Sequence, residues 1–114
     1  MNEVLLVITH LPDSESARRL AEAAIDSRVA ACVNILAPCR SVYRWQGKME
    51  TADEVPLLIK TTAAAYARLE ALIRAHHPYE LPEILAVSVN AGLPDYLQWV
   101  AAETQPGDPV TEAK

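Results

Sequence analysis

The residues best suited to chemistry lie in one short segment, which reads His76-His77-Pro78-Tyr79-Glu80-Leu81-Pro82-Glu83. Two imidazoles, one phenol and two carboxylates occur within it, and divalent transition metals accept neutral imidazole and carboxylate as ligands. The two prolines restrict the backbone, which lowers the ordering cost of binding a ligand. The segment therefore indicates a candidate metal site, although no Cys-x-x-Cys or His-Glu-x-x-His spacing is present.

The same segment also fits a purely structural role. His76 can pack on the apolar stripe of the preceding helix, and His77 can cap the end of that helix. Tyr79 and Glu80 can hydrogen-bond within the loop. Because structural polar loops are common and ligand sets are rare, the residues by themselves leave both interpretations open.

Reactive groups elsewhere in the chain are few. Lys60 ends a predicted strand, where its ammonium can bind an anionic ligand or pair with Glu80 or Glu83. Cys32 lies in mid-strand, where an inert buried thiol is expected, whereas Cys39 follows a proline in a loop, where a thiol is more exposed. No base adjoins either cysteine and no glycine-rich phosphate loop is present. These residues favour a protein that is not an enzyme and that has no organic cofactor.

Composition limits the class of protein. The chain has 114 residues, of which 51% are hydrophobic and 22% are charged, as in one packed domain, here expected to cover residues 1–103. A net charge of -5 argues against nucleic-acid binding, which needs clustered cations. No apolar run approaches the roughly 18 residues of a membrane span, and no signal peptide is evident, so we expect a cytoplasmic protein. Residues 104–114 are expected to form a disordered tail.

Apolar patterns predict the elements that position these side chains. The first strand covers Val4–Ile8, and a helix follows a cap at Asp13 or Ser14. This helix presents one apolar stripe at helical spacing, which comprises Ala17, Leu20, Ala21, Ala24 and Ile25. A second strand covers Val29–Leu36 and ends at Pro38.

A hairpin is predicted next. Ser41–Trp45 alternates polar and apolar residues, as a half-buried strand does. Gln46-Gly47-Lys48 forms a tight turn, whose glycine can adopt positive φ. Met49–Asp53 returns from the turn, and Val55–Thr61 is expected as a separate strand, with an edge or a bulge near its proline.

The rest of the chain completes the pattern. Thr62 can cap a second helix, whose stripe comprises Ala65, Leu69, Leu72 and His76. The last strand covers Ile84–Asn90, and Pro94 suits the first turn of a short helix over Tyr96–Val100. The resulting order, β-α-β-β-α-β with a final helix, predicts an α+β fold of the ferredoxin-like kind. In this fold an antiparallel sheet carries two helices on one face.

The predicted strands are apolar on both faces. Runs such as Val4–Ile8 and Ile84–Val87 contain no polar position at all. Only one face of the sheet can meet the helices, and soluble monomers rarely expose a large apolar face. Other copies of the chain are the favoured cover for the second face. The alternative is that the short C-terminal helix and the hairpin cover it within one chain.

Five ordered motifs resemble those of one known family, the CutA divalent-cation tolerance proteins. The resemblance extends from about Val4 to Glu103. The motifs are Ala31-Cys32-Val33-Asn34-Ile35, Ser41-Val42-Tyr43-Arg44-Trp45-Gln46-Gly47-Lys48, Ile59-Lys60-Thr61, His76-His77-Pro78-Tyr79-Glu80 with Pro82-Glu83-Ile84, and Tyr96-Leu97-Gln98-Trp99.

The resemblance implies an assembly and a role. Members of this family are homotrimers similar in architecture to the PII signalling proteins. The hairpin around Tyr43, Trp45 and Gly47 is then expected to pair with neighbouring chains. The implied role is tolerance to divalent metals, especially copper, with Cu(II) or another divalent cation bound near the clefts between subunits.

The resemblance also assigns ligands. His77 and Glu83 occupy the positions of candidate metal ligands, with His76 as a neighbour. Some members carry a cysteine where this chain has Thr9, so a soft thiolate ligand for Cu(I) is missing here. His10 adjoins that position, but successive strand residues point to opposite faces. At the end of the first strand, His10 could join a site if the fold brings it close, or it could be a polar surface residue.

A second function is compatible with the same resemblance. PII-like trimers bind small ligands in the clefts between subunits. The cleft residues would then be Lys60, Tyr79 and Glu80, with the lysine as the cation that receives an anionic small molecule.

Overall fold

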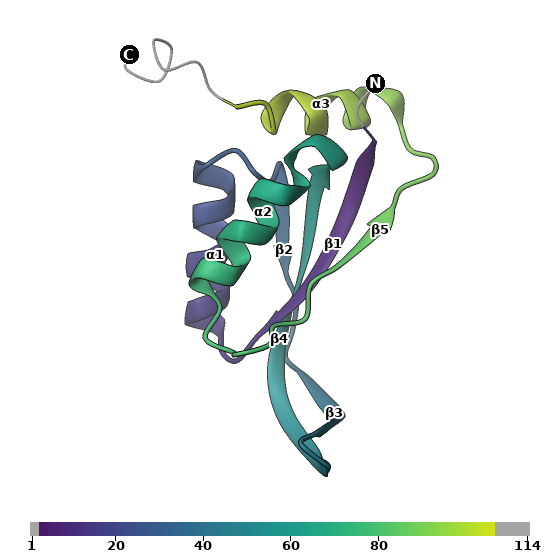
Figure 1. Ribbon diagram of the computed structural model, residues 1–114. Helices are drawn as coiled ribbons and strands as arrows, with labels where there is room; N and C mark the ends of the chain where they lie inside the picture. Colours follow the sequence, from purple (N-terminus) through teal and green to yellow (C-terminus); the bar gives the residue numbers. More distant parts are fainter. Residues whose placement is uncertain (1–2, 107–114) are drawn as a thin grey trace.

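Eight helices and strands follow one another in the computed structural model, which describes residues 3–106 (Figure 1). They are β1 (Val4–Leu11), α1 (Ser14–Asp26), β2 (Cys32–Ile35), β3 (Cys39–Trp45), β4 (Lys48–Thr62), α2 (Ala63–His76), β5 (Leu85–Ser88) and α3 (Pro94–Glu103). The strands lie in the order β2-β4-β1-β5, all neighbours are antiparallel, and β3 pairs with the first half of β4. This is the predicted ferredoxin-like order, so the fold prediction is confirmed.

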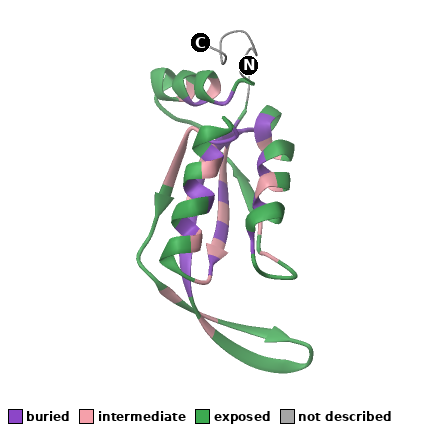
Figure 2. Cartoon of the chain, turned by 90° about the vertical axis from the view of Figure 1, so that its left-hand side faces the viewer, coloured by how far each residue is buried: buried purple, intermediate pink, exposed green. Residues whose placement is uncertain are grey.

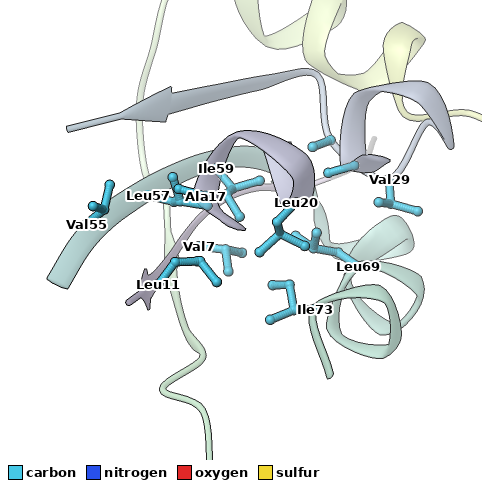
Figure 3. Packing of buried hydrophobic residues seen from close by; sticks show 12 residues of the cluster. Val7, Leu11, Ala17, Leu20, Val29, Val55, Leu57, Ile59, Leu69 and Ile73 are labelled. Carbon is cyan, nitrogen blue, oxygen red and sulfur yellow. The ribbon is translucent and has the colours of Figure 1, made fainter. Parts of the chain in front are cut away.

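Both long helices lie on one face of the sheet, and the core fills the space between them and the strands (Figure 3). Asp13 caps α1 by accepting a hydrogen bond of 2.7 Å from the Ser16 amide, as predicted for one of the two candidate caps. The helix residues Leu20, Leu69 and Ile73 are almost fully buried. They meet sheet residues that point toward the helices, which include Val7, Leu57 and Ile59.

Two stripe residues differ from the prediction. Ile25 is 44% exposed because it lies at the edge of the α1 stripe, one position beyond the fully buried Ala24. His76 is exposed at the end of α2, and the buried position one turn beyond Ile73 belongs to His77 instead.

The second face of the sheet carries apolar side chains that the long helices do not reach. Leu6 and Ile8 are half-buried there, while Leu85 and Val87 of the edge strand β5 are 55% and 50% exposed. Helix α3 lies across one end of the sheet (Figure 1). The prediction that the strands are apolar on both faces is therefore confirmed, and this second face is named the open face below.

The predicted break before Val55 is absent, because β4 runs without interruption over fifteen residues. Pro56 fits inside this strand for a local reason. Its carbonyl accepts a hydrogen bond from the Leu36 amide, just beyond the end of β2. Since the N–H and C=O of a strand residue point to the same side, the missing N–H of Pro56 faces the end of β2 and the β1 ladder stays intact.

The first half of β4 and β3 form a long hairpin that projects from the body of the molecule (Figure 1). Its residues are almost all exposed (Figure 2). The two turn residues, Gln46 and Gly47, have φ of +52° and +80°. Such a turn with two positive φ values matches the twist of the strands that it joins.

Several boundaries also differ from the sequence prediction. β2 begins at Cys32 because a turn with positive φ at Arg28 precedes it. β5 ends at Ser88, two residues before the predicted end. Thr104, where the tail was expected to begin, is buried and hydrogen-bonds the Thr62 hydroxyl. The rest of the predicted tail, residues 107–114, lies outside the described residues.

Candidate functional site

A groove of about 860 Å³ opens between the hairpin and the loop that follows α2. Its lining combines aromatic, acidic and imidazole groups, which include His10, Tyr43, Trp45, Glu54, Tyr79 and Glu83. Strand alternation places the side chains of His10 and Glu54 on the open face of the sheet, at the base of the hairpin.

The loop after α2 is fastened to the end of β1. The buried hydroxyl of Thr9 donates a hydrogen bond of 2.6 Å to the Glu83 carbonyl. His77 Nε2 donates to the His10 carbonyl at 2.6 Å, and His77 Nδ1 accepts from the Tyr79 amide at 3.1 Å. Because Nδ1 accepts a hydrogen bond, this arrangement requires the neutral tautomer with its proton on Nε2.

These bonds give His77 a structural place in the fold. Its side chain is buried and both ring nitrogens are occupied within the chain, so neither faces the groove as a free ligand. His76 is exposed on α2, with Nδ1 3.0 Å from the Leu72 carbonyl. The two neighbouring histidines therefore lie in different surroundings, and the structure does not bring them together with Glu83 as one ligand set.

The carboxylate of Glu83 meets His10 instead. The distance from His10 Nδ1 to Glu83 Oε1 is 3.3 Å, but the two groups are not aligned as a hydrogen bond. His10 Nδ1 is shielded from solvent and has no hydrogen-bond partner within the described part of the chain. An imidazole nitrogen and a carboxylate oxygen thus lie side by side, and the imidazole nitrogen has no hydrogen-bond partner in the described part of the chain.

Tyr79 connects the loop to the hairpin. Burial raises the pKa of Tyr79 to about 12, and the hydrogen bond to Glu54 and the charge of that carboxylate add to the increase. Glu54 is itself only 8% exposed. The Tyr79 ring also packs on His77, with 4.7 Å between the ring centroids. The phenol therefore stays protonated at neutral pH and fixes one wall of the groove.

Lys60 lies apart from this groove. Its side chain is on the open face, where Nζ donates to Asn34 Oδ1 and lies 3.9 Å from Cys32 Sγ. The ion pair expected with Glu80 or Glu83 is not formed. The structure thus separates Lys60 from Tyr79 and Glu80, the two residues that were expected to share a cleft with it and that do line the groove.

The predicted interface residues lie on the hairpin. Tyr43 and Trp45 are 44% and 38% exposed, and both also line the groove. Gly47 lies at the tip. The sequence did not indicate Glu54 as a site residue, and it indicated His10 only as a strand-end residue that could join a site if the fold brings it close. The alternation of β1 and β4 was the available signal, because it places both residues on one face.

Among residues 3–106, no group of three or more histidine, cysteine, aspartate or glutamate side chains is arranged to hold a metal ion. Transition-metal sites in proteins usually have three or four protein ligands. The described part of one chain therefore holds no complete ligand set, and His10 and Glu83 form an imidazole–carboxylate pair within it.

The strand order, the helices on one face and the groove beside the hairpin define a ferredoxin-like α+β protein with an imidazole–carboxylate pair at the groove. Residues 5–103 match the family described as CutA1 divalent ion tolerance protein, and the chain belongs to this family. It is 42% identical over 104 residues to the divalent-cation tolerance protein CutA of Thermus thermophilus, which covers 91% of this chain and 99% of that protein.

Solved structures agree with this assignment. The crystal structure of CutA from Xylella fastidiosa is 44% identical and superposes with a TM-score of 0.87, covering 90% of this chain and 98% of that one. A CutA protein of Archaeoglobus fulgidus, described as a periplasmic divalent cation tolerance protein, is 31% identical with a TM-score of 0.86, covering 90% and 99%. None of the helices within the described residues is long and apolar enough to cross a membrane.

Proposed function

We propose that this protein is a non-enzymatic homotrimer that confers tolerance to divalent metals by binding copper, as Cu(II), or another divalent cation near the contacts between subunits. Membership of the divalent ion tolerance family supports the role in tolerance. The observation that carries the proposed binding is the pair formed by His10 and Glu83, in which a shielded imidazole nitrogen lies 3.3 Å from a carboxylate oxygen. Imidazole and carboxylate together suit Cu(II) and related ions.

A second copy is proposed to complete the ligand set. The exposed imidazole of His76 keeps Nε2 available, because only Nδ1 contacts the Leu72 carbonyl. It can serve as a further ligand from the same chain or from a neighbour. His77 is proposed as the residue that holds the site in place, since its two nitrogens bind the backbone of β1 and of the loop.

The surface of the chain supports assembly. Leu85 and Val87 expose an apolar strip along the β5 side of the open face, and the hairpin presents Tyr43 and Trp45 beside the groove. Aromatic side chains are frequent anchors of protein interfaces, and exposed apolar strips of this kind are usually covered by a partner. Two cysteines that form no disulfide suit the cytoplasm, which we propose as the location.

Calorimetric titration of Cu(II) into the purified protein tests the binding. We expect a saturable heat above that of the free ion, with a large loss of affinity in His10→Gln and in Glu83→Gln. Glu80→Gln is the matched control, because Glu80 is another exposed carboxylate of the groove but is not paired with His10. Absence of saturable heat, or equal binding by Glu83→Gln and wild type, would remove this metal site.

Light scattering of a dilute sample tests the assembly. We expect three times the mass of one chain, and a shift toward lower mass when Val87→Lys places a charge on the apolar strip. The mass of a single chain in wild type contradicts the proposed trimer and the sites at its contacts.

The alternative function is a PII-like trimer that binds an anionic small molecule. One observation favours it: Lys60 has no carboxylate within ion-pair distance in the described structure, so its ammonium is available to an anion. A thermal-shift screen of anionic metabolites tests this function, since a ligand that binds the folded state raises the unfolding temperature. A stabilising metabolite whose effect persists in Lys60→Gln would exclude Lys60 as the binding cation.

A further inference from the structure

One polar residue interrupts the buried stripe of β1. Val7, Thr9 and Leu11 point to the helix side of the sheet, and all three side chains are fully buried. A buried hydroxyl costs free energy unless it forms a hydrogen bond, whereas valine would fill nearly the same space without that cost. The hydroxyl of Thr9, and not only the volume of its side chain, is therefore expected to have a role.

The partner of this hydroxyl belongs to a proposed metal ligand. Thr9 donates a hydrogen bond of 2.6 Å to the backbone carbonyl of Glu83. The carboxylate of the same glutamate lies 3.3 Å from Nδ1 of His10. Two successive residues of β1 thus meet the two ends of Glu83, because Thr9 contacts its backbone and His10 faces its carboxylate.

The ladder between β1 and β5 does not extend to Glu83. It ends at the pair formed by Ile8 and Leu85, so Glu83 precedes the paired segment by two residues. Pro82, directly before it, has no amide N–H to donate. The bond from Thr9 therefore continues the attachment of this segment to β1 beyond the ladder, and it does so at the residue that carries the carboxylate.

The other end of the loop is held by the next residue of β1. The carbonyl of His10 accepts the hydrogen bond from His77, whose ring also accepts from the Tyr79 amide. The loop is thus attached to two adjacent residues of β1, and the attachment through Thr9 is the one at Glu83. Because the side chain of Thr9 is enclosed within one chain, this attachment does not depend on whether another copy covers the open face.

We propose that Thr9 is a positioning residue of the metal site, whose hydroxyl holds the backbone of Glu83 so that its carboxylate stays beside the imidazole of His10. This inference rests on the metal site proposed above. Thr9 acts through Glu83 and needs no contact with the ion, since its hydroxyl is buried and donates to a carbonyl. Replacing a group that orients a metal ligand typically weakens metal binding by about 10- to 100-fold.

Calorimetric titration of Cu(II) into the assembled protein compares wild type with Thr9→Val, which lacks the hydroxyl, and with Thr9→Ser, which keeps it. We expect Thr9→Val to bind copper at least about tenfold more weakly and Thr9→Ser to bind nearly as well as wild type. Thr61→Val is the matched control. Thr61 is equally buried and donates a hydrogen bond of 2.7 Å to the Val29 carbonyl, but it does not line the groove. Its replacement should lower stability and leave the copper affinity unchanged.

NMR relaxation of the metal-free protein gives a readout that does not require copper. The order parameter of the Glu83 amide should fall in Thr9→Val and stay at the wild-type value in Thr9→Ser and in Thr61→Val. Circular dichroism confirms that each variant is folded.

The two measurements separate this inference from the metal site on which it rests. Absence of copper binding in wild type would refute the metal site and, with it, this role of Thr9. Wild-type affinity in folded Thr9→Val would overturn the role of Thr9 alone and leave the metal site standing. An unchanged order parameter at Glu83 in this variant, or an equal loss of affinity in Thr61→Val, would do the same.

Discussion

Replacing His77 by alanine tests whether this residue holds the fold or binds the metal. The substitution removes the hydrogen bonds to the His10 carbonyl and from the Tyr79 amide, and it removes the packing on the Tyr79 ring. Each hydrogen bond contributes about 1 kcal/mol, and a partner left unpaired costs about 1–3 kcal/mol. We therefore expect a loss of about 2–4 kcal/mol in the free energy of unfolding, measured by urea denaturation.

His76→Ala is the control for this experiment, because it removes an exposed imidazole of the same chemistry at the adjacent position. It should change the stability by no more than about 0.5 kcal/mol. All samples need the same chain concentration, since the stability of an oligomer depends on it. Unfolding of His77→Ala at the same urea concentration as wild type would contradict the structural role of His77. A variant that keeps its stability and loses copper binding would identify His77 as a ligand instead.

Four further changes have distinct expected outcomes. Gln46→Asn should stabilise the fold by up to about 1 kcal/mol, because asparagine tolerates the positive φ of +52° better than glutamine. The thermal unfolding temperature should rise accordingly, and an unchanged temperature would contradict this expectation. Gly47→Val should cost about 1–2 kcal/mol through its φ of +80° alone, since an added Cβ meets no atom within 4 Å, and sedimentation should then show weaker assembly. The stability advantage of wild type over Tyr79→Phe should be complete below pH 10 and disappear as the pH rises to about 12, because the folded state raises the pKa of this phenol. Urea denaturation of both proteins at several pH values measures this advantage. A difference that stays constant with pH would argue against the hydrogen bond to Glu54. Ile59→Ala should lower the unfolding free energy by about 2–5 kcal/mol, because this side chain is fully buried in the central strand, and a loss below 1 kcal/mol in denaturation would show that the core adapts to the cavity.

The order of elements could be predicted because it depends on local patterns. The stripe through Leu20 and Ala24 and the cap at Asp13 each involve residues within one or two helical turns. The glycine of the hairpin turn is an equally local signal. The predicted break before Val55 rested on the usual effect of proline in a strand. The structure accommodates Pro56 because β2 ends beside it, and that fact depends on a strand twenty residues away.

The site could be predicted only in part, because its contacts join distant parts of the chain. The bond from Thr9 to Glu83 spans 74 residues, and the bond from His77 to the His10 carbonyl spans 67. The segment around His77 was correctly predicted as chemically distinctive. The alternative that His77 caps the helix agrees with its place as the C-cap of α2, where its amide donates to the Ile73 carbonyl. The pairing of Glu83 with His10 depends on how the folded loop before β5 lies against the end of β1.

The uninterrupted course of β4 has a consequence for engineering. At about 3.3 Å per residue, fifteen strand residues span roughly 50 Å, and the longest dimension of the molecule is 49 Å. One strand of the projecting hairpin is consequently the first half of β4, and the second half of the same strand carries the buried residues Leu57 and Ile59. Deletion of the hairpin would therefore interrupt β4 itself, and a shortened protein would need a new connection leading into the core half of this strand.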